Sequence, residues 1–344
     1  MDVYQRRSIE HTVEYYPVMF VVSSLIVARS TSNLAPARPL SGKIPCMVRC
    51  PHLDSACRYE ILRRGILAAK RPVHYLELRH SMASLARSFD KYAAYGQSVQ
   101  SSRDEARFLR VLYRNINGDE PIVLREDFCG TFAMSCEWAK LGPEKVAIGL
   151  DLDPEPLEYG IRHHLSALTA DAQSRVTVRE RDVLARFSTK ADIIAALNFS
   201  YFAFHSRETL VQYFTACRKA LRKSGLLVVD TFGGPQHGEP SSDSYRFPKF
   251  TYYFEQEHFD PISNRSRFSI LFKPKGSQRR TRAFTYDWRL WSIAEIRDAM
   301  LDAGFKHVDV YWEGTGRDGR GSGRFSRREK GEPCQVWVAY LVAR

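Results

Sequence analysis

Acidic side chains follow three consecutive apolar runs of the sequence. Glu126 and Asp127 lead into Gly130, Asp151 ends the next run, and Asp182 follows the third. In an open α/β sheet, ligands bind outside the edge where the carboxyl ends of parallel strands meet. Asp151 comes about 20 residues after Gly130, the spacing at which a carboxylate accepts hydrogen bonds from ribose hydroxyls. The pattern therefore predicts a site for a ligand that contains a nucleoside.

Each of these groups also has a purely structural interpretation. Asp151 could cap a helix that opens at Pro154, although Asp153 is better placed for that role. Asp182 could be an ordinary loop aspartate. The polar and aromatic stretch Asn198–Tyr201 (NFSY) follows the fourth apolar run and could pack against the edge of the sheet. These alternatives stay open at this stage.

Short apolar runs alternate with amphipathic stretches, which is typical of a parallel sheet covered by helices on both faces. The predicted strands cover residues 121–125, 146–150, 176–180, 191–197 and 225–231. The predicted helices cover residues 88–101, 104–117, 131–141, 154–168 and 207–222. The fold class that follows is α/β.

After the fifth strand the pattern changes to long strands of aromatic and charged residues. We expect an antiparallel insertion at about 240–290, a helix over 292–303, and final strands near 306–312 and 335–343. Residues 314–331 are predicted to form a loop rich in Gly and Arg. Much of the net charge of +12 falls in the first hundred residues and in a basic run from Arg265 to Arg282. That run contains no acidic residue and lies inside the insertion.

Five segments together resemble the successive motifs of class I methyltransferases that depend on S-adenosylmethionine (SAM). They read VLREDFCGT, GLDLDPEPL, RDV, AALNFSYF and LLVVDTFGG, and the likeness covers about residues 88–344. More narrowly, the segments DFCGT, NFSY, AFTYDWRLW and YWEGT resemble a bacterial group of predicted methyltransferases of unknown substrate. The resemblance implies a Rossmann-like fold with a mostly parallel, seven-stranded sheet and an antiparallel β insertion after the fifth strand. It also implies SAM as the cofactor.

The resemblance assigns site residues one by one. Those implied to bind the cofactor are Glu126, Asp127, Cys129 and Gly130 at the methionine portion, Asp151 at the ribose with its neighbour Leu152, Asp182 at the adenine with its neighbour Val183, and Asn198 near the sulfonium. Asn198 and Tyr201 are the catalytic candidates. The chain departs from the commoner Gly-x-Gly-x-Gly loop, because Phe128 and Phe132 stand at two of the glycine positions. This departure argues against a dinucleotide, whose pyrophosphate needs those glycines for close backbone approach.

Methyl transfer from a sulfonium needs in-line positioning and, for some acceptors, a base. The candidate bases are His205, Tyr201, Asp230 and Glu313, which the sequence does not rank. We expect a small-molecule methyltransferase, with the insertion as a lid and the basic run selecting an acidic acceptor. The alternatives are an RNA methyltransferase that uses the insertion and the Arg-rich segment 317–328, and a protein that binds SAM without catalysis. Asn198 and Tyr201 also have the Asn-x-x-Tyr spacing of the Asn-Pro-Pro-Tyr signature, so an amino target stays open.

The first 85 residues lack a sustained helical or strand period. We expect them to form an N-terminal extension, with residues 86–344 as the methyltransferase domain. Cys46, Cys50, Cys57 and His52 do not have the spacing of a zinc site, so no metal is expected. The seven cysteines form no even framework and no apolar stretch is long enough to span a bilayer, which favours a cytoplasmic protein. The sequence does not determine the oligomeric state.

Overall fold

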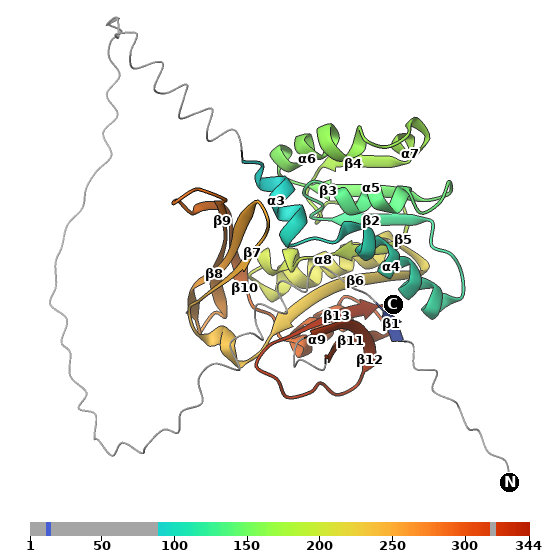
Figure 1. Ribbon diagram of the computed structural model, residues 1–344. Coiled ribbons are helices and arrows are strands. Elements are labelled where there is room, and N and C mark those ends of the chain that lie inside the picture. The colour runs from blue at the N-terminus through green and yellow to red at the C-terminus, as the bar shows by residue number, and fades with distance from the viewer. Residues whose placement is uncertain (1–11, 15–88, 317–320) are drawn as a thin grey trace, which may run out of the picture. The chain divides into compact units, whose positions relative to one another are not determined.

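The computed structural model describes residues 12–14, 89–316 and 321–344 (Figure 1). Apart from residues 12–14, the predicted extension 1–85 and its cysteines lie outside the described residues, so the domain boundary near residue 86 stays a prediction. Among the described strands, nine form one sheet in the order β1-β12-β11-β13-β6-β5-β2-β3-β4. Four more form a second, antiparallel sheet. The predicted α/β fold is confirmed.

The parallel half of the main sheet matches the five predicted strands. They are β2 (Val123–Asp127), β3 (Val146–Asp151), β4 (Val176–Glu180), β5 (Ala191–Ala196) and β6 (Leu221–Gly233). β5 is buried along its whole length, as expected for a strand covered on both faces, and its one charged side chain, Asp192, accepts hydrogen bonds from the N–H groups of Ile122 and Val123. The chain runs outward from β2 through β3 to β4 and then returns to β5 on the other side of β2. Strand order therefore reverses between β2 and β5, where open α/β sheets bind ligands.

The other half of the sheet is antiparallel and larger than predicted. β13 (Trp337–Ala343) pairs antiparallel with both β6 and β11 (Val308–Thr315). The seven predicted strands are thus present, and β12 (Gly321–Arg328) and β1 (Thr12–Glu14) extend the sheet. The predicted loop 314–331 is therefore wrong over the residues of β12. Its only large apolar side chain, Phe325, is 1% exposed and packs 4.7 Å from the ring of Tyr340.

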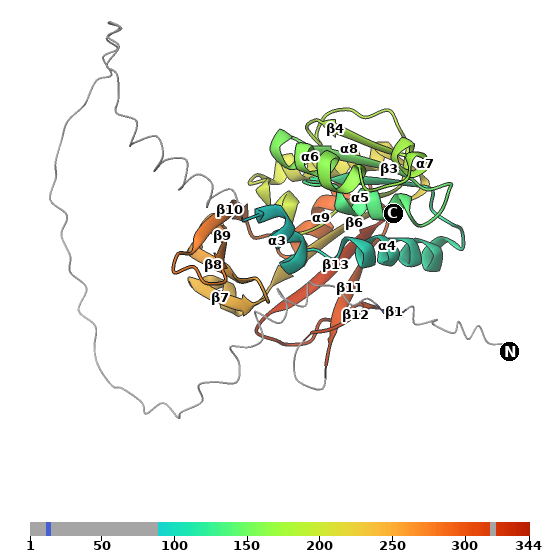
Figure 2. The same ribbon diagram turned by 45° about the horizontal axis from the view of Figure 1, so that its top comes forward.

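Helices cover both faces of the main sheet (Figures 1 and 2). α4 (Ser102–Asn117) packs on α5 (Ala133–Ala139), and α8 (Arg207–Ala220) packs on α9 (Ile293–Asp302). The other described α-helices are α3 (Lys91–Ser98), α6 (Pro154–Gly160) and α7 (Ala170–Ser174). A π-helical turn, Ile161–Leu165, follows α6, and two 3₁₀ turns cover Ser200–Ala203 and Pro235–Gly238. The helix predicted over 154–168 therefore changes its winding after Gly160. Within the described residues, no helix combines the length and apolarity needed to cross a bilayer.

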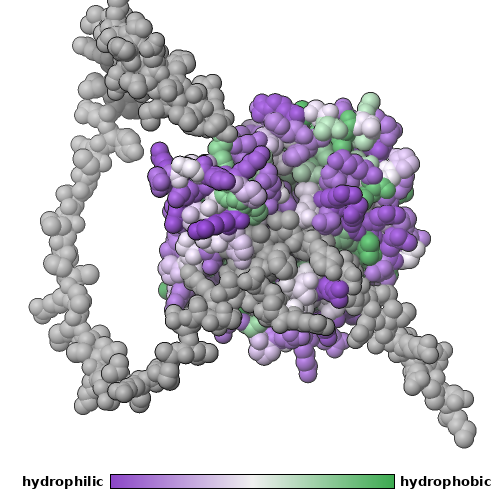
Figure 3. All heavy atoms as spheres, in the orientation of Figure 1, coloured by the Kyte–Doolittle hydropathy of each residue, from purple (hydrophilic) through white to green (hydrophobic). Residues whose placement is uncertain are grey.

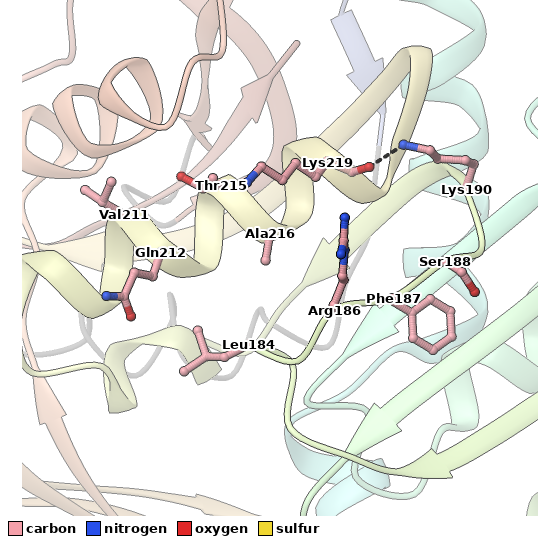
Figure 4. Close-up of a pocket in the computed structure, with 10 residues that line it drawn as sticks. All are labelled: Leu184, Arg186, Phe187, Ser188, Lys190, Val211, Gln212, Thr215, Ala216 and Lys219. Carbon is pink, nitrogen blue, oxygen red and sulfur yellow. Dashed lines mark hydrogen bonds between the residues drawn. The ribbon is translucent and has the colours of Figure 1, made fainter.

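The connection between β4 and β5 contains no helix, although all of its residues, 181–190, are described. Parallel strands are usually joined by a helix that covers the sheet. Here a hollow of about 920 Å³ lies between this connection and α8, with Leu184 and Phe187 on one side and Val211 and Thr215 on the other (Figure 4). The Lys190 ammonium bridges one end by donating to the carbonyl of Lys219. This hollow thus lies on a face of the sheet and not at the strand ends.

The predicted antiparallel insertion is confirmed as the second sheet. It consists of β7 (Ser241–Arg246), β8 (Phe250–Asp260), β9 (Arg265–Pro274) and β10 (Thr281–Arg289), in the order β10-β9-β8-β7. Three arginines of the basic run form ion pairs with acidic residues within this sheet, namely Arg265 with Asp287, Arg280 with Glu255 and Arg282 with Glu257. In the space-filling view, the region of this sheet at the left of the described chain is largely hydrophilic (Figure 3).

Gly160 is the point where α6 and the loop after β2 approach most closely. A Cβ at this position would lie 2.3 Å from the Thr131 carbonyl oxygen and 2.4 Å from the ring of Phe132. We therefore expect Gly160→Ala to destabilise the protein by about 1–3 kcal/mol through overpacking, against the intrinsic helix preference for Ala. Chemical denaturation measures this change.

Gly96 supplies the matched control for this prediction, since it is exposed within α3 and a Cβ there would meet no atom within 4 Å. Gly96→Ala should leave the free energy of unfolding unchanged or raise it by up to about 1 kcal/mol. A Gly160→Ala protein as stable as Gly96→Ala would contradict the close packing.

Candidate functional site

A cavity of about 280 Å³ lies at the carboxyl ends of β2, β3 and β5, at the switch in strand order. α3 and β10 form the opposite wall, and the two elements lie side by side in Figure 2. The residues that line the cavity are Tyr92, Tyr95, Gln100, Phe128, Cys129, Gly130, Thr131, Asp151, Asp153, Pro156, Asn198, Ser200, Ala203, Phe284, Tyr286 and Trp288. Four of the predicted site residues are therefore brought together, namely Cys129, Gly130, Asp151 and Asn198.

The loop after β2 keeps a glycine-like backbone without all of the glycines. Phe128, Gly130 and Phe132 have φ angles of 56°, 51° and 44°, in the left-handed region. A non-glycine residue pays roughly 1–2 kcal/mol for this conformation. Packing offsets that strain, because the Phe132 ring is completely buried and the Phe128 ring lies 5.8 Å from that of Tyr213. A Cβ on Gly130 would meet no atom within 4 Å, so the backbone there faces open space.

Asp151 joins this loop to the end of β3. Its Oδ2 accepts a hydrogen bond of 2.7 Å from the Gly130 N–H, and its Oδ1 accepts one of 2.9 Å from the Asp153 N–H. Asp153, in contrast, caps α6 by accepting from the Glu155 N–H. Asp153, and not Asp151, therefore caps α6. The Asp151 carboxylate is left half-buried at the rim of the cavity, where its predicted role at the ribose remains a prediction.

Glu126 and Asp127 are adjacent in β2, so their side chains lie on opposite faces of the sheet. Glu126 accepts hydrogen bonds from the N–H and the hydroxyl of Ser135 in α5, and burial raises its pKa to about 7. Asp127 accepts from Arg125 at 2.6 and 3.0 Å and from the Tyr213 hydroxyl at 2.9 Å. Both carboxylates are buried and neither lines the cavity.

Leu152, predicted near the ribose, and Asp182 and Val183, predicted at the adenine, lie outside the cavity lining. Leu152 follows Asp151 and is 63% exposed, which is unusual for a leucine beside a cavity. Asp182 is exposed and accepts from the Leu184 N–H, whereas Val183 is buried and its carbonyl accepts from Arg125. Their contact with adenine stays a prediction. Of these three side chains, only Leu152 has a large exposed apolar surface.

Asp230 in β6 positions the NFSY segment. Its two carboxylate oxygens accept hydrogen bonds of 2.7 and 2.9 Å from the N–H groups of Asn198 and Phe199, which have φ angles of 58° and 59°. The Tyr201 hydroxyl donates to the Asp230 carbonyl, and Tyr201 is completely buried. The structure therefore brings Asn198 and Ser200 to the cavity, whereas Tyr201 lies in the core and outside the cavity lining.

The other candidate bases also lie away from the cavity. Burial raises the pKa of Asp230 to about 7, but both of its oxygens are already engaged with backbone N–H groups. His205 donates from Nε2 to the Asp287 carbonyl. Glu313, on β11, accepts from the Gly323 N–H, and burial raises its pKa to about 7. None of these candidate bases lines the cavity. The structure therefore places none of them beside the space where a methyl acceptor would bind.

We expect Asp230→Asn to disorder the NFSY segment. An amide supplies one acceptor and two donors, so one of the two backbone N–H groups would face another donor. An unsatisfied buried group costs about 1–3 kcal/mol, which denaturant unfolding would detect. Asp298→Asn, on the exposed face of α9, is the control that should change nothing. Equal stability of the two variants would mean that Asp230 does not hold the segment.

The sequence patterns did not predict the cluster of aromatic side chains that lines the cavity. Phe284, Tyr286 and Trp288 occur at alternate positions of β10, so they share one face of the strand. Tyr92 and Tyr95 reach the same wall from α3, and the Phe284 ring lies 5.8 and 5.1 Å from these two rings. The alternation in the segment AFTYDWRLW was visible. The cavity that this face of β10 lines is determined by the position of the whole second sheet. The sequence of the segment alone does not reveal that position.

No family model and no curated protein matches this chain. Solved structures do match. An S-adenosylmethionine-dependent methyltransferase from Clostridium acetobutylicum is 15% identical with a TM-score of 0.52, over 79% of this chain and 98% of that one. CalS10, an amino pentose methyltransferase from Micromonospora echinaspora, is 20% identical with a TM-score of 0.52, over 73% and 97%. The methyltransferase CcbJ from Streptomyces caelestis is 15% identical with a TM-score of 0.51, over 70% and 88%. The fold is therefore that of class I methyltransferases, as the motifs predict.

Proposed function

We propose that this chain is a SAM-dependent methyltransferase that acts on a small molecule. The observation that carries the proposal is the junction between Asp151 and Gly130. It places a half-buried carboxylate beside a backbone that faces open space, at the point where strand order reverses. A carboxylate suits ribose hydroxyls, and an open backbone suits the methionine portion of SAM. The fold of the similar structures supports the same cofactor.

The residues present fit SAM better than they fit a dinucleotide. Phe128 and Phe132 occupy the positions where a pyrophosphate needs glycine for close approach. Aromatic rings around the cavity suit the positive sulfonium through cation–π attraction. Bound SAM supplies an activated methyl group, and the residues of this chain would orient the acceptor and exclude water. In this account the exposed Leu152 packs on the nucleoside, and Asn198 lies near the methyl group.

A small molecule is favoured over RNA as the acceptor. The cavity has a volume of only about 280 Å³, six of its 16 lining residues are aromatic, and none of its described lining residues is Lys or Arg. Part of the predicted phosphate-binding surface is also neutralised, since Arg265, Arg280 and Arg282 form ion pairs within the second sheet. RNA affinity that falls steeply with salt would favour the alternative.

Calorimetric titration with SAM and with NAD⁺ tests the proposal. We expect one SAM per chain in the micromolar range and no heat from NAD⁺. Binding of NAD⁺ in preference to SAM, or of neither ligand, would overturn the proposed cofactor. SAM binding without formation of S-adenosylhomocysteine from any acceptor would instead favour the non-catalytic alternative.

A further inference from the structure

Five aromatic side chains enclose the side of the cavity that faces away from the main sheet. Tyr92 and Tyr95 come from α3, and Phe284, Tyr286 and Trp288 come from β10. The rings contact one another, with Tyr286 stacked 4.6 Å from Trp288 and Tyr95 edge-on to Phe284 at 5.1 Å. All but Trp288 are partly exposed, so part of each of these side chains can contact a ligand. We name these five residues the aromatic wall.

The charged side chains among the described residues that line the cavity are all negative. Asp151 and Asp153 are the only charged side chains among the described residues that line it. This finding opposes the earlier expectation of an acidic acceptor selected by the basic run, because a carboxylate or phosphate would find no described cation there. An aromatic wall with nearby carboxylates instead favours a positively charged ligand.

The aromatic wall already contacts one ammonium group of this chain. The Lys91 Nζ lies 4.8 Å from the centroid of the Tyr92 ring and 5.5 Å from that of Phe284. Its ion-pair partner, Glu155, is 2.7 Å away. Lys91 does not line the cavity, so it does not occupy the acceptor position. The contact nevertheless establishes that these two rings accommodate an ammonium group at cation–π distance.

The hydroxyl groups of the wall are suited to an N–H donor. Burial raises the pKa of both Tyr95 and Tyr286, so their hydroxyls stay neutral at physiological pH. Behind them, the Tyr252 hydroxyl is buried and has no hydrogen-bond partner among the described residues. Neutral phenols can accept hydrogen bonds from an ammonium or amine.

We propose that the methyl acceptor is an amine, which the aromatic wall selects in its ammonium form. This inference rests on the proposed methyltransferase function and names its substrate class. The absence of His205, Asp230 and Glu313 from the cavity agrees with it. A hydroxyl acceptor would need a base to remove its proton during the reaction, whereas a neutral amine already carries a free electron pair.

The reaction balances without any further reagent. The bound ammonium loses one proton to water, which leaves a neutral amine. Its electron pair attacks the methyl carbon of SAM, the carbon–sulfur bond breaks, and the bonding pair stays on sulfur as S-adenosylhomocysteine. The nitrogen then carries a fourth bond and a positive charge, and it can release a second proton to water. The wall therefore has to attract the cation and hold the nitrogen in line with the carbon–sulfur bond.

Binding of three probes to the full chain saturated with S-adenosylhomocysteine tests the inference. The probes are benzylamine and benzyl alcohol, which are isosteric with each other, and benzoate, which shares their phenyl ring; they are positive, neutral and negative at neutral pH. Since S-adenosylhomocysteine has no methyl group to transfer, the titration reports binding alone. We expect benzylamine to bind about 10-fold more tightly than benzyl alcohol, which corresponds to about 1.4 kcal/mol, and benzoate to bind most weakly.

Two variants locate the probe. Tyr286→Leu removes one ring of the wall and should weaken benzylamine about 10-fold, whereas the affinity for S-adenosylhomocysteine, which has no positive sulfur for a cation–π contact, should change by less than about 3-fold. Tyr253→Leu removes a ring from the same sheet that lies outside the cavity, stacked on Arg280, and should change neither affinity. Retained binding of S-adenosylhomocysteine would confirm that both variants are folded.

Several outcomes would overturn the amine assignment. These are equal or tighter binding of benzyl alcohol or benzoate, benzylamine binding that is insensitive to Tyr286→Leu, and no binding of any probe to the S-adenosylhomocysteine complex. Failure of the wild-type chain to bind S-adenosylhomocysteine is a separate result. It would refute the proposed methyltransferase function and not the properties of the wall.

Discussion

Asp151→Ala should raise the dissociation constant for SAM about 10- to 100-fold. A hydrogen bond to a charged group contributes about 1.5–3 kcal/mol, and in our account the Asp151 carboxylate provides such bonds to the ribose hydroxyls. The substitution also removes the oxygen that accepts from the Gly130 N–H, so the loop after β2 would lose its link to β3. Both effects weaken cofactor binding, and calorimetric titration of the variant measures them together.

Two further variants separate these effects. Asp151→Asn retains one acceptor oxygen and should bind SAM with an intermediate affinity. Glu158→Ala removes a carboxylate from the exposed surface of α6, close in the sequence but away from the cavity lining, and should bind like wild type. If Asp151→Ala bound SAM as tightly as Glu158→Ala did, the ribose assignment would be wrong.

Asp127→Ala should destabilise the protein by about 3–5 kcal/mol. Asp127 and Arg125 are each 1% exposed, and their closest ion-pair distance is 2.6 Å. Removing the carboxylate leaves a buried guanidinium without its counter-ion and the Tyr213 hydroxyl without its acceptor. Loss of a single partner from a buried pair is far more damaging than loss of an exposed one. Denaturant unfolding measures the change in free energy.

Asp302→Ala is the control for this prediction. Asp302 pairs with Arg207, but their side chains are 56% and 49% exposed, so solvent already screens the pair. Its removal should change stability by less than about 1 kcal/mol. Similar losses in the two variants would show that the buried pair has no special role. If folded Asp127→Ala also binds SAM normally, Asp127 supports the fold and does not hold the methionine portion.

The regular elements could be predicted because the pattern that specifies them is local. Short apolar runs predicted β2 to β6, and the aromatic, charged strands predicted the second sheet. β12 was missed because Phe325 is its one large apolar residue, surrounded by Gly, Ser and Arg. Its place in the sheet depends on pairing with β11 and on packing against Tyr340, contacts that its own composition does not reveal.

The candidate site could be predicted at the level of strand ends, but not at the level of side-chain direction. Glu126 and Asp127 stand where an acidic motif predicts cofactor contacts, yet both carboxylates lie against helices. The partners that hold Asp127 include Tyr213, which is 86 residues away in the sequence. Likewise, the aromatic wall combines α3 with β10, nearly two hundred residues apart by their numbering. Such long-range juxtapositions require the folded chain.

A crystal structure of the full chain with S-adenosylhomocysteine would test the central claim most directly. The account predicts the ligand at the carboxyl ends of β2, β3 and β5, with its ribose hydroxyls on Asp151, its amino-acid portion over Gly130 and its sulfur directed towards the aromatic wall. A ligand bound elsewhere, such as in the hollow beside α8, or with its ribose away from Asp151, would contradict the proposed active site.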